Sequence, residues 1–165
     1  MHLEESRFGS PCGELTVVTR EGRLVGLGFS DGDASLRRSL ARRFGAAPVA
    51  GPAPKAITRA LDAYFGGELG ALDDVAVDAG GTPFQQRVWQ ALRRIPAGET
   101  VAYRDLARTI GAPDAVRAVG AANGANPIGI VVPCHRVIAA DGTLHGYAYG
   151  LDRKRWLLRH ESAIA

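Results

Sequence analysis

Hydrophobic and polar positions in the first thirty residues follow a pattern typical of β-strands. Residues 15–19 and 24–29 are rich in β-branched and aliphatic side chains. Glu21-Gly22 lies between the two runs and predicts a hairpin turn. An earlier turn is expected at residues 10–13, Ser-Pro-Cys-Gly, after a strand that ends near Phe8.

Helical spacing replaces this pattern in the next fifty residues. Leu36, Leu40 and Phe44 recur at intervals of four, and Gly45 is a stop signal. After a proline-rich loop, a second apolar stripe predicts another helix, which Gly66-Gly67 should end. The stripe comprises Ile57, Leu61, Tyr64 and Phe65. Residues 72–79 have an extended pattern, and Gly80-Gly81 predicts a domain boundary.

The remainder of the chain is predicted to be mostly helical. Thr82 is an expected N-cap, Pro83 suits the first helical position, and Gln85 is spaced for a capping box. This helix should end at Ile95-Pro96.

Further helices are expected at residues 103–110, 114–123 and 153–161. The first two flank Gly-Ala-Pro, a helix-turn-helix pattern that the sequence cannot separate from an ordinary helical hairpin. The continuous apolar run at residues 128–132 suits a short buried strand.

Length and composition narrow the class of protein. A chain of 165 residues that is 46% hydrophobic and 22% charged is typical of a globular protein with one domain or two small ones. No apolar run is long enough to span a bilayer, and the acidic start predicts no secretory signal. Two cysteines and four scattered histidines predict neither a disulfide scaffold nor a structural zinc site. We therefore expect a cytoplasmic protein with no metal and no cofactor.

Charge is distributed unevenly along the chain. Residues 1–82 carry nine basic and eleven acidic groups, whereas residues 83–165 carry eleven basic and six acidic groups. The basic excess of the second half is almost entirely arginine, which presents a planar fork to phosphate. Nucleic-acid binding is one interpretation, and an ordinary solvated surface is the other.

Cys134 is the candidate nucleophile. It follows the apolar run, and its neighbours His135 and Arg136 add a base and a positive charge that favours thiolate. In an extended chain, neighbouring side chains point to opposite faces, so a Cys134–His135 hydrogen bond needs a turn, which Pro133 makes plausible, or a bridging water. The alternative is a small buried hydrophobe, the role we expect for Cys12.

Arg117 is a long side chain on a helix made otherwise of small residues. Such a helix commonly packs in a core, but its small residues, among them Ala118 and Ala122, would also let DNA approach closely while Arg117 reaches in.

Taken together, these residues resemble the O6-alkylguanine-DNA alkyltransferase family, the methylated-DNA–protein-cysteine methyltransferases. The resemblance is nearly continuous from Thr82 to Glu161 and looser before it. Its motifs are Phe84-Gln85-Gln86-Arg87-Val88-Trp89, Ile95-Pro96-Ala97-Gly98-Glu99-Thr100, Arg117-Ala118-Val119-Gly120, Asn126-Pro127, Ile130-Val131-Val132-Pro133-Cys134-His135-Arg136-Val137-Ile138, Gly146-Tyr147 and Trp156-Leu157-Leu158.

The resemblance implies an α+β protein. Residues 1–80 would form a small α/β domain with an antiparallel sheet and ribonuclease-H-like topology. Residues 81–165 would form a mostly helical DNA-binding and active-site domain with a helix-turn-helix. The implied activity is single-turnover DNA repair, in which a monomer flips O6-alkylguanine, and also O4-alkylthymine, out of double-stranded DNA through the minor groove. Its alkyl group, mainly methyl, passes irreversibly to Cys134.

The resemblance also assigns roles to residues. His135 would act as a base on Cys134 through a water molecule, and Glu161 would orient His135. Tyr103 would rotate the phosphate and assist the leaving guanine, Arg117 would fill the gap left by the base, and Asn126 would be a hinge. The remaining expected contacts with substrate or DNA are the carbonyls of Cys134 and Val137, together with Tyr147, Ala148, Tyr149, Lys154, Gln85, Ala118 and Ala122.

The sequence departs from the family at Tyr149, where glycine is usual. Its side chain would narrow the pocket and favour methyl over benzyl adducts, or its position would demand a backbone conformation that suits glycine.

Three other functions fit parts of the sequence. An alkyltransferase-like protein would bind lesions without transferring the alkyl group, but the presence of Cys134 argues against it. A helix-turn-helix transcription factor would leave Cys134, His135 and Glu161 unexplained. A thiol hydrolase would turn over without labelling itself.

Overall fold

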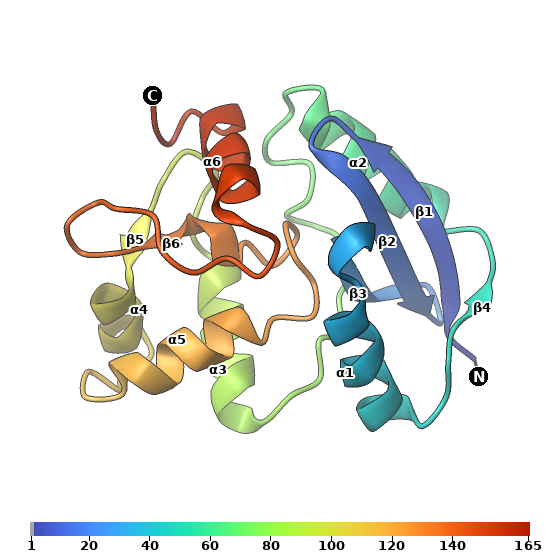
Figure 1. The fold of residues 1–165 in the computed structure, drawn as a ribbon, viewed down its shortest axis with the longest axis horizontal. Helices are drawn as coiled ribbons and strands as arrows, with labels where there is room; N and C mark the ends of the chain where they lie inside the picture. Colours follow the sequence, from blue (N-terminus) through green and yellow to red (C-terminus); the bar gives the residue numbers. More distant parts are fainter. Residues whose placement is uncertain (1) are drawn as a thin grey trace. The chain divides into compact units, whose positions relative to one another are not determined.

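A computed structural model of the protein describes residues 2–165, and the chain divides into two compact units. The first unit comprises the residues up to Gly80 together with Pro127–Val131, and the second comprises Gly81–Asn126 and Val132–Ala165. Strands dominate the first unit and helices the second, as expected for an α+β fold (Figure 1). The short segment Pro127–Val131, which the sequence placed with the helical part, belongs to the first unit.

A four-stranded sheet forms the centre of the first unit. Its strands are β1 (Glu4–Ser10), β2 (Gly13–Arg20), β3 (Arg23–Phe29) and β4 (Val49–Ala50), in the order β3-β2-β1-β4. The first three are antiparallel, whereas the two residues of β4 pair with β1 in parallel. The expectation of an antiparallel sheet therefore holds for all strands except this short edge.

The β2–β3 hairpin has the expected two-residue turn. Both Glu21 and Gly22 have positive φ angles, 53° and 79°, which is the type I′ geometry that matches the twist of paired strands. Glycine adopts a positive φ without steric cost, so Gly22 avoids backbone strain at the second position of the turn.

Two helices complete the core of the first unit. Helix α1 (Ala34–Phe44) follows the 3₁₀ turn η1 (Ser30–Gly32) and lies in front of the sheet in Figure 1, whereas α2 (Lys55–Phe65) lies behind it. One buried cluster joins α1 to the sheet and comprises Leu3, Val18, Val25, Leu36 and Leu40. On α2, the buried residues are Ile57, Leu61 and Tyr64, as their spacing predicts.

The expected extended segment at residues 72–79 is only partly extended. Residues 71–74 form turns closed by bonds such as Val75 N–H to Leu72 O at 3.2 Å, and only Val77 bridges to Leu24 of β3. Leu72 and Val75, three residues apart, are both buried. In a turn, two side chains three residues apart can both face the core, whereas in a strand they would point to opposite faces.

Helix α3 (Pro83–Arg93) opens the second unit and begins as predicted. The Thr82 hydroxyl accepts from Gln85 N–H at 3.1 Å, and Gln85 Oε1 accepts from Thr82 N–H at 3.0 Å. This complete capping box satisfies two of the backbone N–H groups that a helix start leaves unpaired.

The other helices of this unit are α4 (Tyr103–Thr109), α5 (Val116–Gly124) and α6 (Leu151–His160). Helices α3, α4 and α5 pack against one another, and strands β5 (Val101–Ala102) and β6 (Val137–Ile138) pair in parallel. Helix α5 begins two residues later than expected because residues 112–115 form a turn, in which Ala115 N–H donates to Ala112 O. Helix α6 begins two residues earlier, directly after Gly150, whose φ of 99° favours glycine.

The apolar run at residues 128–132 is buried but is not the strand predicted from the sequence. Only Ile128 makes a bridge, to Leu27 of β3, and the chain then turns. Val131 N–H donates to Gly129 O at 2.7 Å across Ile130, whose φ is 68°. A positive φ in a β-branched residue is a genuine outlier, so the sequence carried no signal for this γ-turn.

Candidate active site

The candidate nucleophile lies on a short 3₁₀ helix, η2 (Cys134–Arg136). Pro133 before it has φ −81° and ψ 66°, and Cys134 N–H donates to Val132 O at 2.8 Å. These values define an inverse γ-turn, which the ring of proline favours by restricting φ. Successive side chains of a 3₁₀ helix are about 120° apart. Cys134 and His135 therefore do not point to opposite faces, as they would in a strand.

Three buried side chains, two of which follow Cys134 in the sequence, form a hydrogen-bonded network. His135 Nε2 lies 2.9 Å from Glu161 Oε2, and both side chains are fully buried. Arg136 donates to both oxygens of Glu161, each at 2.9 Å, and to the Ile95 carbonyl at 2.6 Å. Glu161 is the residue just after α6, so the end of this helix supplies the carboxylate for η2.

The network determines which nitrogen of His135 is basic. Hydrogen bonds from His135 and Arg136 outweigh the burial of Glu161 and hold its pKa far below the usual range. An ionised carboxylate only accepts hydrogen bonds, so His135 Nε2 carries the hydrogen and Nδ1 carries the lone pair. Nδ1 is buried and has no hydrogen-bond partner among residues 2–165. Burial also lowers the pKa of His135, so the ring is a neutral base at pH 7.

The Cys134 thiol is held neutral at rest. Burial raises its pKa, while a hydrogen bond from Asn126 and the positive charge of Lys154 lower it. Arg136 was expected to favour the thiolate, but its guanidinium is committed to Glu161 and Ile95. The cation that acts on the sulfur is Lys154 instead.

Lys154 lies fully buried on α6. Its ammonium donates to Val137 O at 2.6 Å and to His145 O at 2.9 Å. Burial lowers its pKa to about 8, and the charge that Cys134 acquires on ionisation opposes this shift. Lys154 therefore attaches the loop that contains His145 to β6, through the same Val137 carbonyl that was expected to receive a guanine amino group.

Three tyrosines lie in or against the loop that contains His145. The Tyr103 hydroxyl donates to His145 O at 3.4 Å, and burial together with the nearby Cys134 raises the pKa of Tyr103. The rings of Tyr147 and Tyr149 meet edge to face, with centroids 5.9 Å apart. Tyr149 does not have a positive φ; the glycine-like conformation falls on Gly150. The departure at Tyr149 therefore changes the side chains around the loop without straining the backbone.

The expected DNA-contacting residues of α5 divide between its two faces. Arg117 and Ala118 are exposed, whereas Ala122 is buried and its carbonyl accepts from the Trp89 indole at 2.8 Å. The expectation that Ala122 contacts DNA is wrong, because its place in the helical repeat turns it inward. The side chain of half-buried Gln85 takes part in the capping box of α3. This role accounts for a glutamine at position 85 without any contact with DNA.

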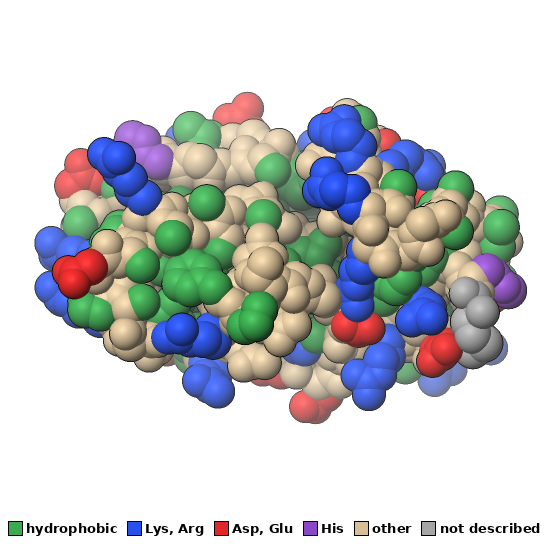
Figure 2. Space-filling model, turned by 90° about the horizontal axis from the view of Figure 1, so that it is seen from below, with side chains coloured by type: hydrophobic (Ala, Val, Ile, Leu, Met, Phe, Trp, Pro, Cys, Tyr) green, Lys and Arg blue, Asp and Glu red, His purple; other side chains and the backbone are tan. Residues whose placement is uncertain are grey.

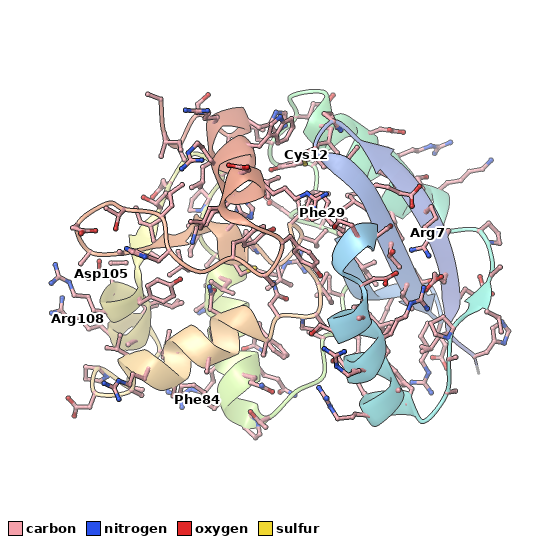
Figure 3. All side chains as sticks on the ribbon, in the orientation of Figure 1. Arg7, Cys12, Phe29, Phe84, Asp105 and Arg108 are labelled. Atoms are coloured by element: carbon pink, nitrogen blue, oxygen red, sulfur yellow. The ribbon has the colours of Figure 1, made fainter. Side chains whose placement is uncertain are left out.

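Basic side chains also lie on the surface outside these elements (Figure 2). On the face drawn in Figure 2, Lys and Arg side chains are dispersed among hydrophobic and other side chains. On α4, for example, Arg108 pairs with Asp105 at 3.4 Å (Figure 3).

No group of three or more His, Cys, Asp and Glu among residues 2–165 could hold a metal ion. Over the same residues, no helix combines the length and apolar character needed to cross a membrane. Cys12 lies at the β1–β2 turn of the first unit (Figure 3), where its Sγ is 3.6 Å from the Ser10 hydroxyl.

Comparison with known proteins bears on both units. The family model of the 6-O-methylguanine DNA methyltransferase ribonuclease-like domain matches residues 5–79, and that of the DNA binding domain matches residues 83–163. The chain belongs to this family. A methylated-DNA–protein-cysteine methyltransferase of Salmonella typhimurium is 48% identical over 99% of this chain and 98% of its own length. One of Mycobacterium leprae is 55% identical over 92% and 88%.

Solved structures of the family show the same fold. The crystal structure of Mycobacterium tuberculosis OGT in complex with DNA has a TM-score of 0.81 and 44% identity, covering 99% of this chain and 94% of that one. The O6-methylguanine-DNA methyltransferase of Pyrococcus kodakaraensis has a TM-score of 0.69 and 27% identity, covering 96% and 98%. The resemblance inferred from the sequence, and the fold class that it implied, are thereby confirmed.

Two site residues were missed by reasoning from the sequence. Arg136 had been interpreted only as a nearby charge, and Asn123 had been given no role. Both are buried and bonded to the active-site segment, through Glu161 and Cys134 O respectively. The sequence contained a weak signal for Asn123, a polar residue on the apolar inner face of a helix.

Proposed function

We propose that this protein repairs DNA by transferring an alkyl group, mainly methyl, from O6 of guanine in double-stranded DNA to its own Cys134. O4-alkylthymine is a second expected substrate. The carrying observation is the placement of a neutral imidazole, oriented by a buried carboxylate, on the residue next to a cysteine in a 3₁₀ turn. This is the nucleophile, base and orienting group that covalent catalysis requires.

The reaction balances with the groups present. The Cys134 proton passes, through a water molecule, to the lone pair on His135 Nδ1, and the positive charge that develops is stabilised by Glu161. The sulfur then forms a bond to the alkyl carbon while the bond from that carbon to O6 breaks. Its electron pair remains on guanine, which takes up a proton. Because cleaving the resulting thioether would have to expel a thiolate, a poor leaving group, the sulfur is not regenerated, and each molecule acts once.

The neutral resting thiol suits this chemistry. A raised pKa protects Cys134 from small electrophiles until substrate is bound, because the thiolate is the reactive form. His135 then removes the proton at the moment of attack. Lys154 supports the developing thiolate by its charge.

We assign DNA binding to the second unit, with α4 and α5 as a helix-turn-helix that enters the minor groove. The exposed residues Arg117 and Ala118 support this assignment: the small side chain permits close approach, and Arg117 is long enough to fill the gap left by an extruded base. Tyr103 would act at the lesion's phosphate and guanine N3, and Asn126 would be the hinge to the nucleophile. Tyr147, Ala148 and Tyr149 would line the pocket.

The wider setting follows from the same proposal. Residues 1–80 and 81–165 would be the two domains, working as a monomer in the cytoplasm, where DNA is accessible and Cys134 stays reduced. Because the charge excess is small, DNA affinity should be modest and should fall as salt rises.

A stoichiometry assay with labelled methyl groups in duplex DNA tests the function. The proposal predicts one methyl group bound per protein molecule and none in Cys134→Ala. Lesion binding without label would indicate an alkyltransferase-like protein, and release of methyl with repeated turnover would indicate a hydrolase. Tight binding to one undamaged sequence, without label, would indicate a transcription factor. Each of these three results would contradict the proposal.

A further inference from the structure

The only two asparagines of the chain lie together at the C-terminal end of α5. Each donates its side-chain amide to a backbone carbonyl of the segment around the nucleophile. Asn126 Nδ2 lies 2.7 Å from Val132 O, and Asn123 Nδ2 lies 3.4 Å from Cys134 O. The first was expected from the sequence as a hinge, whereas the second was not.

Stability does not explain why residue 123 is an asparagine. Its side chain is 5% exposed, on the inner face of α5 beside the buried residues Val119 and Ala122. Its Oδ1 is buried and has no hydrogen-bond partner among residues 2–165. An unpaired buried acceptor costs about 1–3 kcal/mol, and an apolar side chain would avoid that cost.

The bond from Asn123 completes the restraint of the Cys134 peptide. Cys134 O accepts from Val137 N–H, within the 3₁₀ turn, and from Asn123, on the helix beside it. The nucleophile is thus attached to its own turn and to α5. Exposed Arg117 and Ala118 lie on the outer side of this helix.

We propose that Asn123 is a positioning residue that sets the place of Cys134 relative to the DNA-facing side of α5. The proposal rests on the proposed function, in which α5 contacts DNA. Attack on an alkyl carbon requires close approach along one direction, and a misplacement of about 1 Å can reduce a rate about a hundredfold. The Asn123 amide would transmit the position of the docked helix to the sulfur.

The role predicts a specific pattern of rates for Asn123→Leu, which keeps the branch at Cγ but removes the amide. Methyl transfer from O6-methylguanine in a duplex, measured at saturating DNA, should fall about tenfold or more. Affinity for the duplex should be unchanged, because the DNA-facing residues are intact. Methylation of Cys134 by iodomethane, followed on the Cys134 peptide, should change less than about twofold, since this small reagent needs no alignment with α5.

Trp89→Phe is the matched control. Its indole donates to Ala122 O, so this variant also loses a buried hydrogen bond to the same turn of α5 but keeps the bond to Cys134. Its transfer rate at saturating duplex, per folded molecule, should equal that of the wild type.

The outcomes are separable. A wild-type protein that transfers no methyl group overturns the proposed function. A wild type that transfers, with Asn123→Leu equally fast, overturns the positioning role alone. The role is also overturned if Asn123→Leu changes the duplex and iodomethane rates by the same factor, or if Trp89→Phe slows duplex transfer as much.

Discussion

Replacing Arg136 by Met should both destabilise the protein and change the pH dependence of alkyl transfer. Arg136 is 5% exposed and Glu161 is 1% exposed, and the guanidinium donates twice to this carboxylate and once to Ile95 O. Arg136→Met removes these three bonds at once. It leaves the carboxylate hydrogen-bonded to the neutral ring of His135.

The size of the stability loss follows from this burial. Removing one partner of a buried ion pair costs about 3–5 kcal/mol, because the remaining charge is uncompensated. A domain is stable by about 5–15 kcal/mol in total, so the variant should fold but with a small margin. With a urea slope of about 2 kcal/mol/M, the unfolding midpoint should fall by about 2 M.

The pH effect has a definite sign. Arg136 lowers the pKa of His135 by its charge, and Glu161 raises it. Removing Arg136 therefore raises the pKa of His135, so the ring becomes protonated at a higher pH than in the wild type. A protonated ring has no lone pair on Nδ1, so the acid limb of the rate–pH profile should move to higher pH.

The assay combines urea unfolding with single-turnover transfer from pH 5 to 9. Arg155→Met is the control, because Arg155 is 40% exposed and pairs with fully exposed Asp152 at 3.3 Å. That variant should match the wild type in both measurements. The reasoning is refuted if Arg136→Met unfolds at nearly the wild-type urea concentration and its acid limb stays in place.

Three further predictions concern other parts of the second unit. Tyr149→Gly should raise the rate of benzyl transfer more than that of methyl transfer, because the ring beside Tyr147 is removed; unchanged selectivity in paired rate measurements would contradict this. Between pH 8 and 9.5 the unfolding free energy should rise, since Lys154 loses its proton near pH 8 when folded but only near 10.5 when unfolded. Lys154→Met should abolish that rise in urea titrations, and a rise that persists would show that another group causes it. Thr82→Ala should cost about 1 kcal/mol by losing the N-cap of α3, and an unchanged unfolding midpoint would argue against this.

Local chemistry explains which parts of the fold could be predicted. The capping box at Thr82 and the Glu21-Gly22 hairpin depend on residue types at fixed spacings, so both are correct in the structure. The strand predicted at residues 128–132 is absent because the chain turns there at a buried isoleucine with positive φ. No sequence pattern signals a conformation that only the surrounding structure can impose.

The candidate site shows the same division. Cys134 and His135 were named from their own chemistry and Glu161 from the family resemblance, and the structure brings His135 and Glu161 into contact across 26 positions of sequence. The partner of Arg136 could not be found from neighbours in the chain, because Glu161 approaches from the end of α6. Small residues occur on both faces of α5, and only packing shows that Ala118 is exposed whereas Ala122 is buried. The sequence therefore could not show that Ala122 faces away from DNA.

Mass spectrometry of Cys134 tests the central claim most directly. After incubation with a duplex that contains O6-methylguanine, the peptide containing Cys134 should gain about 14 Da, the mass added when methyl replaces hydrogen on sulfur. The Cys12 peptide should be unchanged, and the DNA should contain ordinary guanine. An unmodified Cys134 peptide alongside repaired DNA, or methyl on another residue, would contradict the account.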